Sequence, residues 1–175
     1  MNIYHRIYKL YQRKVPVQQI SATTNIPVKT IKDVIAKFEA KGTFKTEAEL
    51  EAAAEPFLDY IVKKHHKYVV TEFTGSLTEK FSQKVKSAIK ETQQIPGQIL
   101  AVKLENVVEI EDPAMKIILD FKDKVNLSGK TVVFLSPSDV VEDYIAAHNI
   151  EKNTKVFGTQ SAFEEYTFKS TFDKN

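Results

Sequence analysis

The sequence predicts an α+β protein of two domains, in which an all-helical head precedes an α/β body with helices packed on a mixed sheet. Its 175 residues suffice for two small domains, and its 42% hydrophobic and 27% charged residues are typical of globular proteins. Apolar residues first recur at helical spacing, and strand-like and helix-like segments then alternate. We expect a head of residues 1–45, a helical connector of residues 46–66 and a body of residues 67–175.

The charge is divided unevenly between these parts. Residues 1–45 hold nine Lys and Arg against two acidic residues, a net charge of +7, whereas the remaining residues carry 16 basic and 21 acidic ones, a net charge of −5. Such a basic head favours a polyanionic partner such as double-stranded DNA, although an ordinary solvated surface can have the same composition.

The composition argues against several other functions. The chain has no Cys, which excludes thiol catalysis and thiolate metal sites, and its four His are scattered apart from the pair His65–His66, which is typical of a surface. The five glycines are isolated, so no Gly-rich phosphate loop is present. We expect no enzyme activity, no metal and no cofactor. Because no apolar run is long enough for a membrane span or a signal peptide, we expect a cytoplasmic protein without a membrane partner.

The head contains three segments with helical patterns. Apolar and tyrosine side chains recur over residues 3–11, and we expect these tyrosines in the core or at a partner interface. A short amphipathic helix is predicted over residues 17–23. After a turn at Asn25, which tolerates a left-handed backbone, Pro27 opens a third helix that ends at Gly42.

This stretch, VQQISATTNIPVKTIKDVIAKFEAKG, resembles the helix-turn-helix family of DNA-binding domains. The resemblance implies that the third helix enters the major groove. The residues expected to meet base edges are Val28, Lys29, Thr30, Lys32 and Asp33. Those expected to contact phosphates are Arg6, Arg13 and Lys14.

The connector has a helical composition. Thr46 and Glu49 form a capping box, and Ala52, Ala53 and Ala54 favour helix behind it until Pro56 breaks or kinks the helix. Its apolar positions are suited to pairing two chains, and helix-turn-helix proteins commonly present two heads to DNA. We therefore expect a homodimer.

Strands and helices alternate through the body, which predicts a partly parallel sheet. The expected strands are residues 68–74, 99–104, 131–135 and 155–157. The expected helices begin near Leu77, Asp112, Ser138 and Ser161.

Residues 68–168 resemble the STAS domain of anti-anti-sigma factors, stressosome proteins and the cytoplasmic tails of sulfate transporters. The resemblance rests on Gly75-x-Leu77, on VKLENVVEIEDPAMKIIL and on VVFLSPSDVVEDYIAAHNI. It implies a signalling protein whose body binds a protein partner, such as an anti-sigma factor or a kinase. On that register Asp112 replaces the serine that the family phosphorylates, and Glu111 matches the preceding Asp.

Two interpretations of Asp112 remain open. Asp112 is either a helix N-cap ahead of Pro113 or a permanent imitation of phosphoserine, and the two roles are compatible. The sequence as a whole predicts a DNA-binding transcription regulator whose STAS-like body mediates protein interaction or assembly. The alternative is an anti-sigma factor antagonist or stressosome-type interaction protein whose helical head binds protein.

Overall fold

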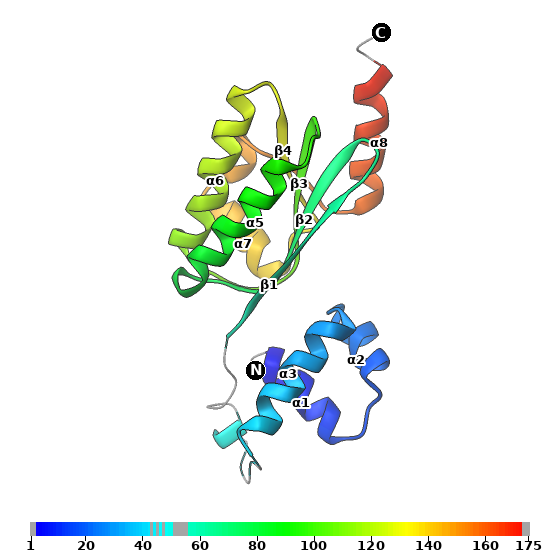
Figure 1. Ribbon diagram of the computed structural model, residues 1–175, viewed down its shortest axis with the longest axis vertical. Coiled ribbons are helices and arrows are strands. Elements are labelled where there is room, and N and C mark those ends of the chain that lie inside the picture. Colours follow the sequence, from blue (N-terminus) through cyan, green and yellow to red (C-terminus); the bar gives the residue numbers. More distant parts are fainter. Residues whose placement is uncertain (1–2, 43, 45, 47, 51–55, 173–175) are drawn as a thin grey trace. The chain divides into compact units, whose positions relative to one another are not determined.

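The computed structural model describes residues 3–42, 44, 46, 48–50 and 56–172. The chain divides into two compact units, Met1–Phe57 and Leu58–Asn175. The first unit is helical and the second contains the sheet, which confirms the predicted fold class (Figure 1).

The first unit contains the three predicted helices, α1 (Ile3–Gln12), α2 (Val17–Thr24) and α3 (Val28–Ala40). Each contributes fully buried side chains to one core, among them Ile7, Ile20 and Ile31. Burial of such aliphatic side chains stabilises the unit by about 1.5–3 kcal/mol each.

Tyr4 and Tyr8 of α1 also belong to this core, whereas Tyr11 is only partly buried. Tyr8 stacks on Phe38 of α3, with ring centroids 4.5 Å apart. The Tyr4 hydroxyl donates a hydrogen bond to the backbone oxygen of Phe57 at 3.1 Å, and both Tyr4 and Tyr8 are buried. Their hydroxyl and ring contacts explain why a stripe of tyrosines is compatible with an interior position.

The predicted capping box is confirmed. The backbone N–H of Glu49 donates to Thr46 Oγ1 at 3.1 Å, and the backbone N–H of Thr46 donates to Glu49 Oε2 at 3.2 Å. Residues 48–50 are helical behind it. The expected helix through Ala52, Ala53 and Ala54 lies outside the described residues.

The second half of the predicted helical connector is instead a strand, β1 (Leu58–Lys64). Tyr60 and Val62 pack against the core of the second unit, whereas Ile61 between them is 45% exposed. Alternation with a period of two residues defines a strand, and antiparallel pairing with β2 (Tyr68–Leu77) fixes it. The prediction of helix here was therefore wrong.

The sheet is mixed, as predicted. Its strands lie in the order β1-β2-β3-β4-β5, with β1 antiparallel to β2 and the other neighbouring pairs parallel. The remaining elements are η1 (Glu79–Phe81), α5 (Ser82–Gln94), β3 (Ile99–Ile110), α6 (Asp112–Leu127), β4 (Thr131–Leu135), α7 (Asp139–Ala147), η2 (Ile150–Lys152), β5 (Lys155–Phe157) and α8 (Gln160–Phe172).

Two strands extend beyond their predicted ends. β2 continues past Gly75 to Leu77, and β3 continues past Leu104 to Ile110. Gly75 has a φ of +109° and lies where the register between the two strands shifts, which is typical of a bulge rather than of a strand end.

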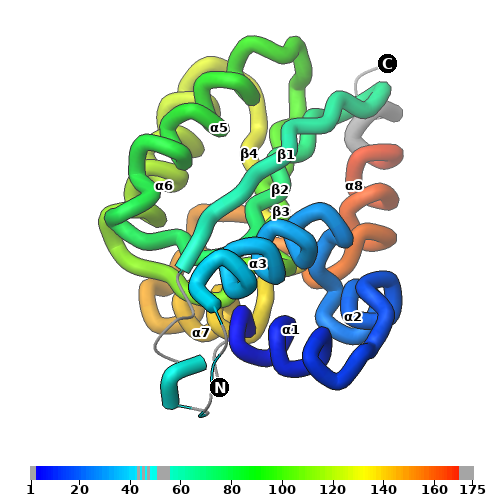
Figure 2. The backbone as a smooth tube through the Cα atoms, turned by 60° about the horizontal axis from the view of Figure 1, so that its bottom comes forward, coloured from blue at the N-terminus to red at the C-terminus, as the bar shows by residue number. Residues whose placement is uncertain are grey.

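Helices cover both faces of the sheet. α5, α6 and α7 pack on one face around a core that includes Phe134, Ile118 and Val141, whereas Phe163 of α8 packs on the other face against Tyr68. Figure 2 shows α6 and α8 on opposite sides of the strands. The carboxyl end of β3 leads directly into α6, and this junction contains Asp112.

Candidate functional site

The turn between α2 and α3 shapes the predicted DNA-binding surface of the first unit. Asn25 ends α2 in the left-handed conformation, with φ 57° and ψ 23°, as the sequence predicts. Ser21 Oγ donates a hydrogen bond to the backbone oxygen of Ile26 at 2.7 Å, and buried Ile20 and Ile26 flank the turn. These contacts fix the orientation of α3 relative to α2.

The start of α3 presents some of the predicted base-contacting residues and buries another. Lys29, Lys32 and Asp33 are exposed, and Val28 is half-buried. Thr30 is only 5% exposed, so its expected outward position is wrong. It lies one helical turn before buried Val34 and therefore shares the inward face of α3.

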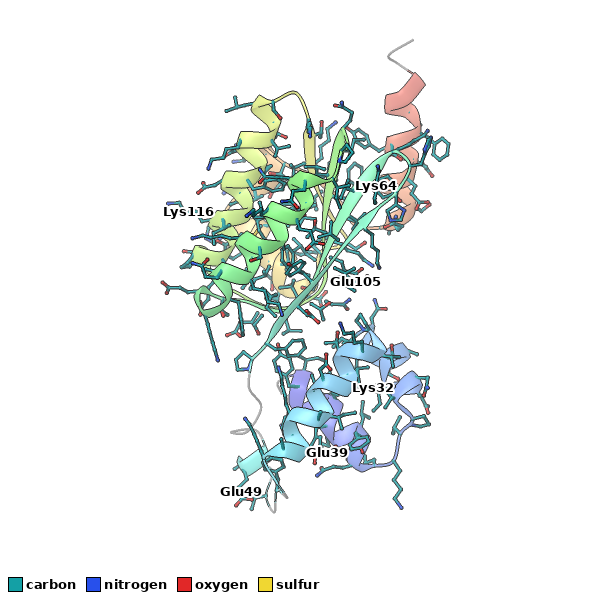
Figure 3. All side chains as sticks on the ribbon, in the orientation of Figure 1. Lys32, Glu39, Glu49, Lys64, Glu105 and Lys116 are labelled. Carbon is teal, nitrogen blue, oxygen red and sulfur yellow. The ribbon has the colours of Figure 1, made fainter. Side chains whose placement is uncertain are left out.

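The exposed cations of this unit come from α1, from the turn that follows α1 and from α3. Arg6 is exposed on α1, and Arg13 and Lys14 are exposed immediately after it. Lys32 extends from α3 (Figure 3). Within the described part of the chain, neither Lys29 nor Lys32 forms an ion pair. Unpaired surface cations of this kind are available for phosphate groups.

In the second unit, Glu111 joins the starts of two helical segments. Its backbone N–H donates to the backbone oxygen of Leu77 at 2.8 Å, and its Oε2 accepts a hydrogen bond from the backbone N–H of Glu79 at 2.7 Å. Its φ of −128° and ψ of 148° place it at the N-cap position of α6. Glu111 therefore connects the β2–η1 junction to the β3–α6 junction.

Asp112 is the first residue of α6 and not its N-cap, so the first of the two interpretations of Asp112 does not hold in the structure. No side-chain hydrogen bond caps this helix, and Glu111 holds the cap position because Met115 N–H donates to its carbonyl oxygen. Asp112 Oδ1 instead accepts a hydrogen bond from the Tyr144 hydroxyl of α7 at 2.7 Å. A carboxylate in the first turn still interacts favourably with the helix dipole.

His148 completes a cluster with Asp112 and Tyr144. Its ring stacks on Tyr144 with centroids 4.0 Å apart, and its Nε2 lies 3.7 Å from Asp112 Oδ1. Burial, followed by the hydrogen bond to Asp112 and the negative charge of that carboxylate, together raise the pKa of Tyr144 to about 12. The phenol therefore remains a neutral donor to this carboxylate at neutral pH.

Carboxylates dominate the segments around the cluster. Exposed Val140, at 41% exposure, adds an apolar side chain on the first turn of α7. Lys116 of α6 is exposed and points away from the sheet (Figure 3). The exposed acidic residues that adjoin Asp112 and Tyr144 in the chain are Glu109, Glu111, Asp139, Glu142 and Asp143. The surface is suited to a basic partner.

Comparisons with solved structures identify the fold of the C-terminal part. It resembles the crystal structure of an anti-sigma factor antagonist from Mycobacterium paratuberculosis, with a TM-score of 0.58 and 14% identity over 63% of this chain and 94% of that one. The unphosphorylated anti-sigma factor antagonist SpoIIAA aligns with a TM-score of 0.47 and 12% identity, over 62% of this chain and 96% of that one. No protein-family model and no curated protein matches the sequence.

The C-terminal part therefore has the STAS fold of an anti-sigma factor antagonist. Across the described segments, no helix is both long and apolar enough to cross a bilayer. The same segments contain no group of three His, Asp or Glu side chains arranged to hold a metal ion.

Proposed function

We propose that this protein is a DNA-binding transcription regulator whose STAS-like unit binds a protein partner. The observation that carries the proposal is the left-handed turn at Asn25, which joins α2 to an α3 with exposed Lys29 and Lys32 at its start. A short helix, a tight turn and a second helix form the unit with which many regulators read the major groove.

The exposed residues of the head are proposed to have two different roles, contacts with base edges and contacts with phosphates. Lys29, Lys32 and Asp33 occupy the first two turns of α3, from which a recognition helix contacts base edges. Arg6 and Arg13 belong to another helix and its end, and they are suited to phosphates, which position the protein without selecting a sequence. Thr30 has no direct role in this proposal because it is buried.

The second unit is proposed to bind an anti-sigma factor or kinase-type protein. Its fold is that of an anti-sigma factor antagonist, and Asp112 occupies the position that the resemblance assigns to a phosphorylated serine. A carboxylate carries about one negative charge, against roughly 1.5–2 for a phosphoserine, and no phosphatase removes it. Control of partner binding must therefore come from another event, such as assembly or partner abundance.

We further propose that the protein acts as a homodimer, because operators with two half-sites require two heads at a fixed spacing. Sedimentation of the full-length protein at micromolar concentration, with and without DNA, tests this point. A monomer under both conditions contradicts it.

Fluorescence anisotropy with labelled genomic fragments from the protein's own promoter region tests DNA binding. The expected result is binding that weakens steeply with salt and that discriminates between fragments. The Lys29→Ala/Lys32→Ala double variant tests the head, and Lys86→Ala, an exposed change on α5, is the matched control. If no fragment binds even at low ionic strength, the head binds protein and the chain is an interaction protein of the anti-sigma antagonist type.

A further inference from the structure

An open groove of about 980 Å³ lies beside β5, the last strand of the sheet. One wall is β5 itself, and the α6–β4 turn and Tyr166 of α8 complete the groove. The groove is separate from the Asp112 cluster, because Asp112 begins α6 and the groove adjoins its other end. The 16 residues of α6 separate the two by about 24 Å.

The outer edge of β5 has no partner strand among the described residues. The Phe157 carbonyl oxygen accepts a hydrogen bond from Ser136 N–H, at the end of β4, so the peptide groups of Phe157 face β4. Because successive residues of a strand alternate in direction, the N–H and C=O of Val156 face the open edge. Such an edge can pair with an added strand.

The lining of the groove is basic. Lys130, Lys152 and Lys155 face it together with a single acidic residue, Glu151. Lys155 Nζ donates a hydrogen bond to the Tyr166 hydroxyl at 2.9 Å and so joins β5 to α8. This charge complements an acidic ligand.

A large apolar side chain lies next to this basic lining. Leu127 is 90% exposed, and it lies in the chain between Asn126 and Gly129, which both line the groove. An exposed leucine adds nothing to the binding of a small inorganic anion. It does favour a polypeptide that brings an apolar side chain along with its carboxylates.

The wall of the groove is held in place from inside the unit. Lys122 of α6 is only 5% exposed, and its Nζ donates to the backbone oxygen of Asn153 at 3.3 Å and to Thr154 Oγ1 at 3.2 Å. Both acceptors line the groove immediately before β5. A preformed wall reduces the entropy cost of binding.

We propose that this groove binds an extended acidic segment of a protein partner, which adds a strand to β5. Backbone hydrogen bonds to Val156 give affinity, and Lys130 and Lys152 select carboxylates. The inference does not depend on DNA binding by the head, because every residue that carries it belongs to the second unit.

The test uses the full-length protein and a short fluorescent peptide of alternating Val and Glu, measured by anisotropy at low salt. The expected result is binding of this peptide and not of its Val–Lys counterpart. The Lys130→Glu/Lys152→Glu variant should weaken binding by about tenfold or more, because two favourable charge pairs become repulsive. Lys86→Glu on α5 is the control and should leave binding unchanged.

Peptides N-methylated on alternate residues test strand addition without changing the protein. Methylation in one of the two registers should abolish binding, because it removes the N–H groups that face β5. If both methylated peptides bind normally, or if Lys130→Glu/Lys152→Glu binds as wild type does, the proposal is wrong. Complete displacement of the peptide by millimolar inorganic phosphate also overturns it and identifies a small-anion site. If the double variant does not fold, the single variant Lys152→Glu tests the charge requirement and the methylated peptides test strand addition.

Discussion

The Tyr144 hydroxyl donates a hydrogen bond to Asp112 Oδ1 at 2.7 Å and joins the first residue of α6 to α7. Three features meet at this contact: a helix N-terminus, a carboxylate and a phenol with a raised pKa. Asp112 is therefore neither a free surface charge nor a cap. Its orientation depends on a residue 32 positions further along the chain.

The first prediction concerns the ionisation of Tyr144. Its pKa in the folded protein is about 12, above the ordinary 10.0, so the neutral phenol is favoured by folding. The resulting stability is fully present below pH 10 and is lost as the pH rises towards 12. In Asp112→Asn the pKa of Tyr144 should fall, because the negative charge is gone, yet stay above 10.0, because burial is the larger cause. NMR titration of ¹³C-labelled tyrosine measures both values.

Tyr11 provides an internal comparison in the same titration. Its pKa is also raised, first by its hydrogen bond to Glu39 and then by the charge of that carboxylate. Tyr11 should titrate identically in wild type and in Asp112→Asn. A Tyr144 that titrates identically in the two proteins would show that Asp112 does not act on the phenol in solution.

Much of the fold follows from local patterns. The three helices of the head, the strands of the sheet core and the capping box at Thr46 all have signals within a few residues, namely spacing, caps and β-branched runs. The strand β1 has only a short signal of this kind, the aromatic and β-branched run Tyr60-Ile61-Val62. The segment LDYIVKK follows an alanine-rich stretch and fits either element, and only its pairing with β2 makes it a strand.

The candidate sites were predicted less completely. The position of Asp112 at a helix start was predictable from Pro113, and the exposure of Lys29 and Lys32 from the helical period. The partnership of Asp112 with Tyr144 and His148 is tertiary. The spacing of Tyr144 and His148, four residues apart on one helix, was the only available signal, and it indicates that they are neighbours without revealing what they face.

The second prediction concerns the turn at Asn25. An alanine is expected to destabilise the first unit by about 1–2 kcal/mol, because its Cβ disfavours a φ of 57°. Glycine has no such penalty, so Asn25→Gly should lose less stability than Asn25→Ala. Calorimetry of the full-length variants measures both changes. Equal losses for the two variants would mean that side-chain contacts of Asn25, and not its backbone conformation, dominate.

The third prediction concerns the salt dependence of DNA binding. If Arg6, Arg13 and Lys14 each neutralise one phosphate, each alanine substitution should reduce the slope of log affinity against log salt by about 0.9. Affinity should fall for all sequences alike. Lys29→Ala or Lys32→Ala should in addition reduce discrimination between sequences by about 1–3 kcal/mol where the side chain reaches a base. Titrations of a specific and a scrambled duplex at several salt concentrations separate the two effects.

The buried position of Thr30 makes it a useful control for that experiment. Thr30→Val keeps the shape of the side chain and removes only its hydroxyl, and the residue is 5% exposed. Base discrimination should not change. A loss of discrimination in Thr30→Val at unchanged stability would contradict the orientation of α3 that is proposed for DNA binding.

The last prediction separates the two roles of Asp112. Asn retains an oxygen that accepts a hydrogen bond from Tyr144 and removes the negative charge, whereas Ala removes both. Asp112 makes no capping bond. The free energy of unfolding of Asp112→Asn should therefore lie within about 0.5 kcal/mol of the wild-type value, and that of Asp112→Ala should be lower than the wild-type value by no more than about 1 kcal/mol. If Asp112 imitates phosphoserine, Asp112→Asn nevertheless changes the recovery of the protein partner.

Pull-down with each variant from an extract of the native cells, followed by quantification of the proteins that wild type retains, measures that recovery. Tyr144→Phe is the matched control, because it breaks the hydrogen bond to Asp112 and leaves the carboxylate charged. The charge-imitation hypothesis requires Tyr144→Phe to retain the partner better than Asp112→Asn does. Equal recovery by wild type and Asp112→Asn, at equal stability, would restrict Asp112 to orienting α6 against α7, and partner binding would then have to use another surface of the unit.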